Sequence, residues 1–348
     1  RTVYASAFQN DPALTEITME EGMDWLDGNV FAECPALERV QLADSITKLG
    51  YRLFYNDTAL KEVNIPVSWK ECPEYNRYYY GHMFEGCSAL TEITIPEELT
   101  VLPAFAFQGC DKLEKIALHS GITQIPDYAF DGCIALTGLE LPDGLVSIGY
   151  AALQDCVSIM ELEFPAGMKI LGERALSGCT GLTALELPEE LITIGAYAFN
   201  GCSALQSITM ANRVTTIDYR AFYNCVRLDS VTLSSAWNSC PEYSRYYYGS
   251  IFEGCSALTR LELTEGQVEL PRNAFQNAPA LRTVILPESL VAIRQEAFSG
   301  CTSVSGIIIP ESITKLEQAI FYGMRGFGNI VIPDSITSIM SSAFRYCY

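Results

Sequence analysis

The sequence predicts a repeat solenoid, with short parallel strands on one face and short helices or turns on the other. A phenylalanine returns every 23 residues along most of the chain, and the same kinds of residue recur around it at fixed positions. One unit of this length cannot bury its own apolar face, whereas stacked units bury that face against one another. The prediction therefore depends on the period and on what each position contributes.

The period is set by the phenylalanine. It occupies thirteen positions: Phe8, Phe31, Phe54, Phe84, Phe107, Phe130, Phe199, Phe222, Phe252, Phe275, Phe298, Phe321 and Phe344. Leu153 and Leu176 fill the two vacant positions. Of the fourteen intervals, twelve are 23 residues and two are 30, which gives about 15 units. We expect the phenylalanine rings to stack as an internal column opposite the strands.

Each unit also carries a turn signal and a strand signal. The second residue after the phenylalanine is almost always Gly, Asn or Asp, the residue types that accept positive φ, so a short helix should end there in a tight turn. A stretch such as Leu90, Ile93 and Ile95 ends in alternation, which indicates a strand with one buried face. Pro96 cannot donate to a strand ladder and should end that strand.

Eleven of the thirteen cysteines lie three residues after the phenylalanine position. This spacing predicts a buried ladder of structural thiols. Metal sites favour short clustered spacings such as C-x₂-C, and the sequence has none, so we predict no metal and no cofactor. Cys72 and Cys240 lie off the ladder, where they are either free or bridged to Cys87 and Cys255.

Composition limits the partners. The chain has 22 Lys and Arg against 42 Asp and Glu, a net charge of −20. This balance argues against binding to nucleic acid or to anionic lipid. No apolar run is long enough for a membrane span. The only histidines, His82 and His119, have no carboxylate or nucleophile placed beside them by the repeat, so we expect no enzyme.

The repeat resembles a known family. The pattern AFxGCxxLxxIxLPxxLxxIGxxAF, clearest at 84–107, 107–130 and 176–199, is similar to the BspA-like (Treponema pallidum-type) leucine-rich repeat. The resemblance covers essentially the whole chain and implies a right-handed leucine-rich-repeat solenoid. It also implies a secreted or surface-located bacterial protein that functions in adhesion. It assigns no individual binding residue, because the shared motif is scaffold.

We expect one solenoid domain over residues 1–348, and a monomer. The opening RTVYASAFQN already lies inside the repeat, so we expect the chain to be a fragment or mature form of a longer protein. The two long units lie 168 residues apart. Residues 68–93 and 236–261 are identical at 18 of 26 positions, which indicates duplication of a block of seven units.

The long units contain the runs CPEYNRYYYG at 72–81 and CPEYSRYYYG at 240–249. Tyr, Trp and Arg are enriched at binding hot spots. The predicted ligand-binding residues are Trp69, Tyr75, Arg77, Tyr78 and Tyr80, with Trp237, Tyr243, Arg245, Tyr246 and Tyr248 in the second copy. Two equal contacts on one rigid body would suit a repetitive ligand. In the alternative interpretation, the tyrosines pack the inserts onto the solenoid, with Tyr79 and Tyr247 in the core.

A second candidate site is the outward face of the sheet. Glu140, Glu163 and Glu186 should follow one another on successive repeats, with Glu161 beside them. Like charges at strand spacing are destabilising unless neutralised, so a cation or a basic partner would relieve them. The alternative is a solvated acidic face. Further along, Ile285, Ile308 and Val331 predict an exposed apolar stripe, either a contact surface or a face covered by other sequence.

The leading hypothesis is a non-catalytic recognition module, secreted or on the cell surface, that adheres to host or neighbouring-cell protein. One alternative is a structural spacer in a larger surface protein. Another is glycan binding by stacking of sugars on the tyrosine-rich inserts. Tyrosines buried beneath the inserts would favour the spacer, whereas exposed and coplanar rings would favour the glycan.

Overall fold

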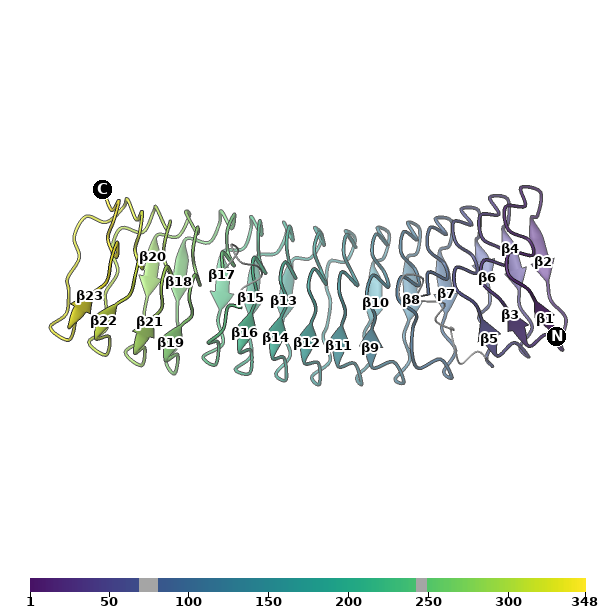
Figure 1. Ribbon diagram of the computed structural model, residues 1–348, viewed down its shortest axis with the longest axis horizontal. Helices are drawn as coiled ribbons and strands as arrows, with labels where there is room; N and C mark the ends of the chain where they lie inside the picture. The colour runs from purple at the N-terminus through teal and green to yellow at the C-terminus, as the bar shows by residue number, and fades with distance from the viewer. Residues whose placement is uncertain (69–80, 242–248) are drawn as a thin grey trace. The chain divides into compact units, whose positions relative to one another are not determined.

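The computed structural model describes residues 1–68, 81–241 and 249–348 (Figure 1). These residues form two compact units, Arg1–Pro165 and Ala166–Tyr348. Each unit is a stack of repeats of the same kind, with parallel pairing between neighbouring repeats. The predicted solenoid is confirmed.

Face strands of two or three residues form the predicted sheet in most of the repeats. In the first unit they are β2 (Glu16–Thr18), β4 (Arg39–Gln41), β6 (Glu62–Val63), β7 (Glu92–Thr94), β8 (Lys115–Ala117) and β10 (Gly138–Glu140). In the second unit they are β13 (Ala184–Glu186), β15 (Ser207–Thr209), β17 (Ser230–Thr232), β18 (Arg260–Glu262) and β20 (Thr283–Ile285). The middle residue is buried and the outer two are exposed, as in β7 and β8. The alternation in the sequence predicted this pattern.

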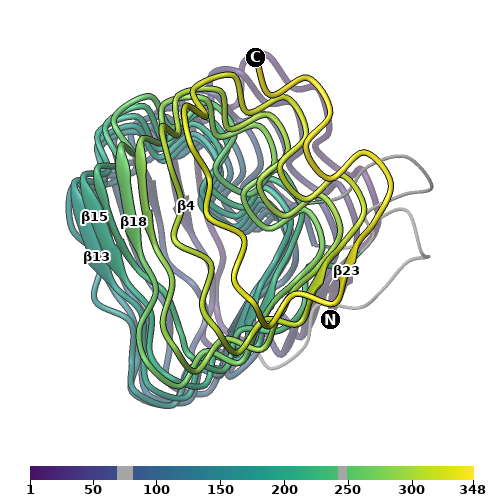
Figure 2. The same cartoon turned by 90° about the vertical axis from the view of Figure 1, so that its left-hand side faces the viewer.

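A second series of short strands lies on the return side of the repeats, where the sequence analysis placed only a returning segment. In the first unit these return strands are β1 (Thr2–Val3), β3 (Trp25–Leu26), β5 (Lys48–Leu49), β9 (Gln124–Ile125) and β11 (Ser147–Ile148). In the second unit they are β12 (Ile170–Leu171), β14 (Thr193–Ile194), β16 (Thr216–Ile217), β19 (Glu269–Leu270), β21 (Ala292–Ile293), β22 (Lys315–Leu316) and β23 (Ser338–Ile339). Figure 2 shows β13, β15 and β18 together on one side of the repeats and β23 on another.

The segment around each phenylalanine consists of tight turns, and the described residues contain no helix. The second residue after the phenylalanine has φ between 57° and 82°, as predicted. The residue two before it is also left-handed, with φ between 47° and 60°, although it is often not glycine. Only three residues separate these two positions, fewer than one turn of α-helix, so no helix forms between them.

The predicted aromatic column is present in each unit. In the first unit, the rings from Phe8 to Phe130 stack with centroids 5.3–5.5 Å apart. In the second unit, the rings from Phe199 to Phe344 stack with centroids 5.0–6.2 Å apart. Leu153 and Leu176 are fully buried.

The predicted cysteine ladder is also present. Cys110 Sγ donates to the backbone oxygen of Phe84 (3.2 Å), and Cys133 Sγ donates to that of Phe107 (3.1 Å). Burial raises the pKa of the Cys110 thiol, as is expected for a structural cysteine. Cys87, Cys240 and Cys255 are free thiols, so a bridge from Cys240 to Cys255 is wrong. Cys72 lies outside the described residues.

Candidate functional site

Most of the predicted insert residues lie outside the described residues. They are Trp69, Tyr75, Arg77, Tyr78, Tyr80, Tyr243, Arg245, Tyr246 and Tyr248, together with Tyr79 and Tyr247. Their role as ligand contacts stays a prediction. The structure does describe where each insert rejoins the solenoid.

Trp237 does not belong to an exposed surface. Its side chain is fully buried, and its ring lies edge-on to Phe275 with centroids 5.8 Å apart. Its indole N–H donates to the backbone oxygen of Ser239 (3.0 Å). The prediction that Trp237 contacts a ligand is therefore wrong, because the core supplies both the apolar contacts and the hydrogen-bond partner that a tryptophan needs.

Each insert ends on a glycine that no other residue can replace without strain. Gly81 has φ of 61°, and a Cβ placed on it would lie 2.2 Å from the backbone oxygen of Ala104. Gly249 has φ of 52°, and its Cβ would lie 2.2 Å from the backbone oxygen of Asn273. The final G of both CPEYxRYYYG runs thus closes the insert tightly against the next repeat. The sequence contained this signal, since the glycine is shared by both copies.

Each closing glycine accepts a backbone hydrogen bond from the preceding repeat. The backbone N–H of Arg52 donates to the Gly81 oxygen (2.9 Å), and that of Arg220 donates to the Gly249 oxygen (3.0 Å). The guanidinium of Arg52 lies over the Tyr55 ring at 4.5 Å. These residues come from the lead-in YRLFYN and its copy YRAFYN. The duplication therefore preserved an arginine beside a tyrosine at the base of each insert.

The second copy adds an ion pair to this base. Arg220 lies 4.4 Å above the Tyr223 ring, and its Nε and Nη2 both donate to Glu253 Oε2 at 2.9 and 2.7 Å. In the first copy the equivalent carboxylate, Glu85, instead contacts His82 Nδ1. The two bases therefore share a backbone plan but differ in their side-chain pairing.

The repeats that follow the inserts differ more strongly. After the first insert, the His82 ring stacks on Phe105 (4.2 Å) and Phe105 stacks on Tyr128 (4.6 Å). The corresponding positions after the second insert are Ser250, Asn273 and Glu296. Asn273 Nδ2 donates to Glu296 Oε2 at 3.2 Å. The repeats after the first insert thus carry stacked aromatic rings, and those after the second carry a polar network.

The long units also interrupt the sheet of face strands. β2, β4 and β6 form one sheet, and β7, β8 and β10 form another. Lys61 N–H donates to the Glu38 oxygen and Glu114 N–H donates to the Thr91 oxygen, but among the described residues Thr91 N–H makes no equivalent bond to Lys61. β17 and β18 likewise belong to separate sheets at the second long unit. At each long unit with its seven extra residues, the two flanking face strands are therefore not hydrogen-bonded to each other.

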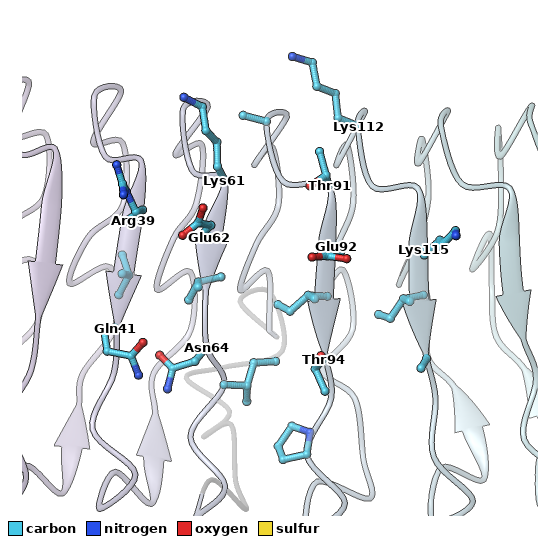
Figure 3. Close-up of a pocket in the computed structure, with 18 of the residues that line it drawn as sticks. Arg39, Gln41, Lys61, Glu62, Asn64, Thr91, Glu92, Thr94, Lys112 and Lys115 are labelled. Carbon is cyan, nitrogen blue, oxygen red and sulfur yellow. The ribbon is translucent and has the colours of Figure 1, made fainter.

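A groove of about 1150 Å³ lies over the break between β6 and β7 (Figure 3). Glu62 and Glu92 lie on the two sides of the break, and Lys61 and Lys112 extend past the starts of the strands (Figure 3). Val67, half of whose surface is exposed, adds an apolar contact. The sequence pattern did not predict this groove, because the seven extra residues mark the position of the insert and not the separation of the face strands beside it.

Of the four glutamates of the predicted acidic ladder, only two lie on face strands. Glu140 ends β10 and Glu186 ends β13, and both are exposed. Glu161 and Glu163 are exposed but lie in a segment without strand structure. Within the described ranges, no three His, Cys, Asp or Glu side chains are arranged to hold a metal ion. A cation or basic partner at these glutamates stays a prediction.

The predicted apolar stripe is exposed. Ile308 and Val331 expose 85% and 80% of their surface, and Ile285 exposes 37%.

A search of the described residues finds no helix that is both long and apolar enough to span a membrane.

Comparison with protein-family models matches this chain to the BspA type leucine rich repeat region in six copies, over residues 1–137, 71–183, 170–251 and 240–348. The chain belongs to the BspA-type leucine-rich repeat family. This membership confirms the predicted resemblance, and the repeat pattern of glycine, cysteine and phenylalanine is the part of the chain that carries it.

Solved structures of similar proteins include several leucine-rich repeat proteins. A leucine-rich repeat protein from Bacteroides ovatus ATCC 8483 is 28% identical, with a TM-score of 0.73 over 99% of this chain and 80% of that chain. The T. pallidum leucine rich repeat protein is 25% identical, with a TM-score of 0.38 over 62% of this chain and 78% of that chain. A leucine rich cell surface protein from Faecalibacterium prausnitzii A2-165 is 22% identical, with a TM-score of 0.39 over 99% of this chain and 80% of that chain. No curated protein matches the chain.

Proposed function

We propose that this BspA-type protein is a recognition module of the cell surface or the secreted fraction, which adheres to host or neighbouring-cell protein through its two inserts. Repeat proteins of this family are generally non-catalytic, and membership indicates protein–protein interaction. The adhesive role, the location and a monomeric state are the parts that we propose.

The matched bases of the two inserts carry this proposal. Both inserts close on a sterically required glycine, and each closing glycine accepts a backbone hydrogen bond from a residue, Arg52 or Arg220, whose guanidinium lies over a tyrosine ring. Rigid closure lowers the entropy lost when a protruding segment binds a partner. Tyr and Arg are also the residue types that dominate binding hot spots.

The test is binding to immobilised collagen, laminin and fibronectin and to a glycan array. One variant carries Arg77→Ala, Tyr78→Ala and Tyr80→Ala together with Arg245→Ala, Tyr246→Ala and Tyr248→Ala. We expect a bound protein to lose at least about tenfold in affinity, because each hot-spot residue contributes on the order of 1 kcal/mol or more. Substitution is preferable to trimming the inserts, since a 23-residue unit would also close the break in the sheet.

A control matched to the changes in one insert removes two tyrosines and an arginine elsewhere on the surface, with Tyr4→Ala, Tyr348→Ala and Arg213→Ala. It should bind like the wild type. Equal binding by the insert variant and the wild type would show that the inserts are not the contact. Absence of binding to every protein and glycan would favour the structural spacer, and binding to glycans alone would favour the sugar-stacking alternative.

A further inference from the structure

The exposed residues at the start of the face strands alternate in charge from β2 to β8, apart from one step. In the backbone register of the sheets, Arg39 lies opposite Glu16 on one side and Glu62 on the other, and Glu92 lies opposite Lys115. Opposite charges on directly neighbouring strands are stabilising, and like charges are destabilising. The order along the sheet is therefore negative, positive, negative, then negative and positive.

The alternation fails only at the break. There, two acidic residues, Glu62 and Glu92, lie on the two sides of the open groove. Neither carboxylate makes an ion pair within the part of the chain that the structure describes. Their basic neighbours, Arg39 and Lys115, lie on the outer sides, one repeat further away (Figure 3). One positive charge placed over the break would restore a fully alternating row.

The spacing fits an extended polypeptide. Neighbouring paired strands lie about 4.8 Å apart, and β6 and β7 are not paired, so Arg39 and Lys115 are each at least about one and a half strand spacings, roughly 7 Å, from the centre of the break. In an extended chain, alternate side chains on one face lie about 6.8 Å apart. A basic residue over the break thus brings the residues two before and two after it to Arg39 and Lys115.

We propose that this groove is a docking site for an extended protein segment with a central Arg or Lys and an acidic residue two positions away on each side. The central cation lies between Glu62 and Glu92, and the flanking carboxylates pair with Arg39 and Lys115. Lys112 at the rim adds to the attraction for these carboxylates (Figure 3). Lys61, also at the rim, is already paired with Glu38 at 3.0 Å. The site goes beyond the proposed adhesion through the inserts and does not depend on the inserts as ligand contacts.

The second long unit provides an internal comparison. Its break is flanked by Ser230 and Arg260 instead of two glutamates, and Arg260 is already paired with Glu262 at 2.8 Å. The second break therefore has no pair of unneutralised carboxylates. The docking segment is specific to the break between β6 and β7, although both long units interrupt the sheet.

Two labelled peptides test the proposal by fluorescence anisotropy: acetyl-TDTRTDT-amide, and acetyl-TRTDTRT-amide, in which the charges are reversed. The first peptide carries a net charge of −1 and the second of +1. Because the protein carries −20, its long-range field favours the second peptide. Tighter binding of TDTRTDT is therefore expected only if the local charge order decides.

Glu62→Gln/Glu92→Gln should weaken TDTRTDT binding about tenfold, as expected for the loss of two solvent-exposed ion pairs. Glu140→Gln/Glu163→Gln removes the same charge from exposed glutamates of the same unit and should leave binding unchanged. A second pair, Arg39→Gln/Lys115→Gln, should weaken TDTRTDT binding to a similar extent. All six positions are exposed, so the variants should keep the wild-type circular dichroism spectrum.

The proposal is overturned if TDTRTDT does not bind at millimolar concentration, if TRTDTRT binds as tightly, or if Glu62→Gln/Glu92→Gln binds TDTRTDT like the wild type. The insert variant with Arg77→Ala and Arg245→Ala should still bind TDTRTDT. Failure of this protein to adhere to matrix proteins would therefore count against the proposed function without deciding the peptide result.

Discussion

Asp57 stands in the cysteine ladder, where neighbouring repeats have Cys34 and Cys87. Its side chain is fully buried, and its Oδ1 accepts a hydrogen bond from Cys34 N–H at 2.8 Å. Its Oδ2 has no partner among the described residues. Because burial disfavours the charged form, it raises the pKa of the Asp57 carboxyl to about 8.

This raised pKa predicts a stability that falls as the pH rises. Between the ordinary aspartate pKa of 3.8 and about 8, the unfolded chain releases a proton that the folded chain retains. The free energy of unfolding should therefore fall across this window, by at most about 1.4 kcal/mol per pH unit, and level off above it. Asp57→Asn keeps the acceptor for Cys34 and should remove this slope, as measured by urea unfolding from pH 4 to 9.

The control is Asp11→Asn, which removes one negative charge at the same position of the first repeat. Asp11 is only half-buried, and its Oδ1 accepts a hydrogen bond from Ala13 N–H. If the free energy of unfolding depends on pH in the same way in Asp57→Asn and Asp11→Asn, the carboxyl of Asp57 does not cause the fall in stability with rising pH.

The closing glycine of the second insert predicts an unequal cost of adding one methyl group. Gly249→Ala and Gly323→Ala both place alanine at positive φ, which costs about 1–2 kcal/mol. A Cβ on Gly249 also meets the backbone oxygen of Asn273, whereas a Cβ on Gly323 meets no atom within 4 Å. Thermal unfolding should show that Gly249→Ala costs roughly 1–3 kcal/mol more. Equal melting temperatures would show that the insert does not close against the next repeat.

At the scale of the element, the cysteine ladder predicts which thiols react. Buried Sγ–H groups such as that of Cys202 donate to a backbone oxygen of the preceding repeat, and burial raises the pKa of the Cys202 thiol to about 12. Such thiols should resist 5,5′-dithiobis(2-nitrobenzoate) in the folded protein. Among the described cysteines, labelling should be fastest at Cys347, which is only partly buried.

Mass spectrometry of the labelled peptides checks this expectation, and labelling in urea should reach all thirteen cysteines. Fast modification of Cys110 or Cys202 in the folded protein would contradict the ladder. The measurement needs no substitution, so it reports on the native packing directly.

The elements that the sequence predicts well are those with one dominant physical cause. Burial of Phe107 and of Ile93 follows from apolar periodicity, and the turn at Gly109 follows from glycine's tolerance of positive φ. The left-handed residue two before each phenylalanine was missed because Phe105 and Tyr128 are not residue types that signal positive φ. Stacking between neighbouring repeats overrides local preference there, and the same constraint removes the expected helix.

At the scale of the whole molecule, repetition explains both what the sequence predicts and what it misses. The repeat reveals the long units as exceptions, but it cannot say which exceptional residue points inward. Trp237 is part of an unusual segment and yet completes the core. The groove between Glu62 and Glu92 depends on how the strands beside the long unit separate, which the spacing of residues does not reveal.

The break between β6 and β7 also bears on how the first unit responds to tension. In a stack of repeats, each repeat is stabilised by contacts with its immediate neighbours only. Among the described residues, this step is joined by the stacked rings of Phe54 and Phe84, 5.3 Å apart, and by turn hydrogen bonds such as Phe54 N–H to the Met83 oxygen at 2.9 Å, but not by a strand ladder. Under pulling, the repeats before β7 should detach as one block. A segment bound from Arg39 to Lys115 would act as a clasp across this weak step, so that binding a partner would also strengthen the module mechanically.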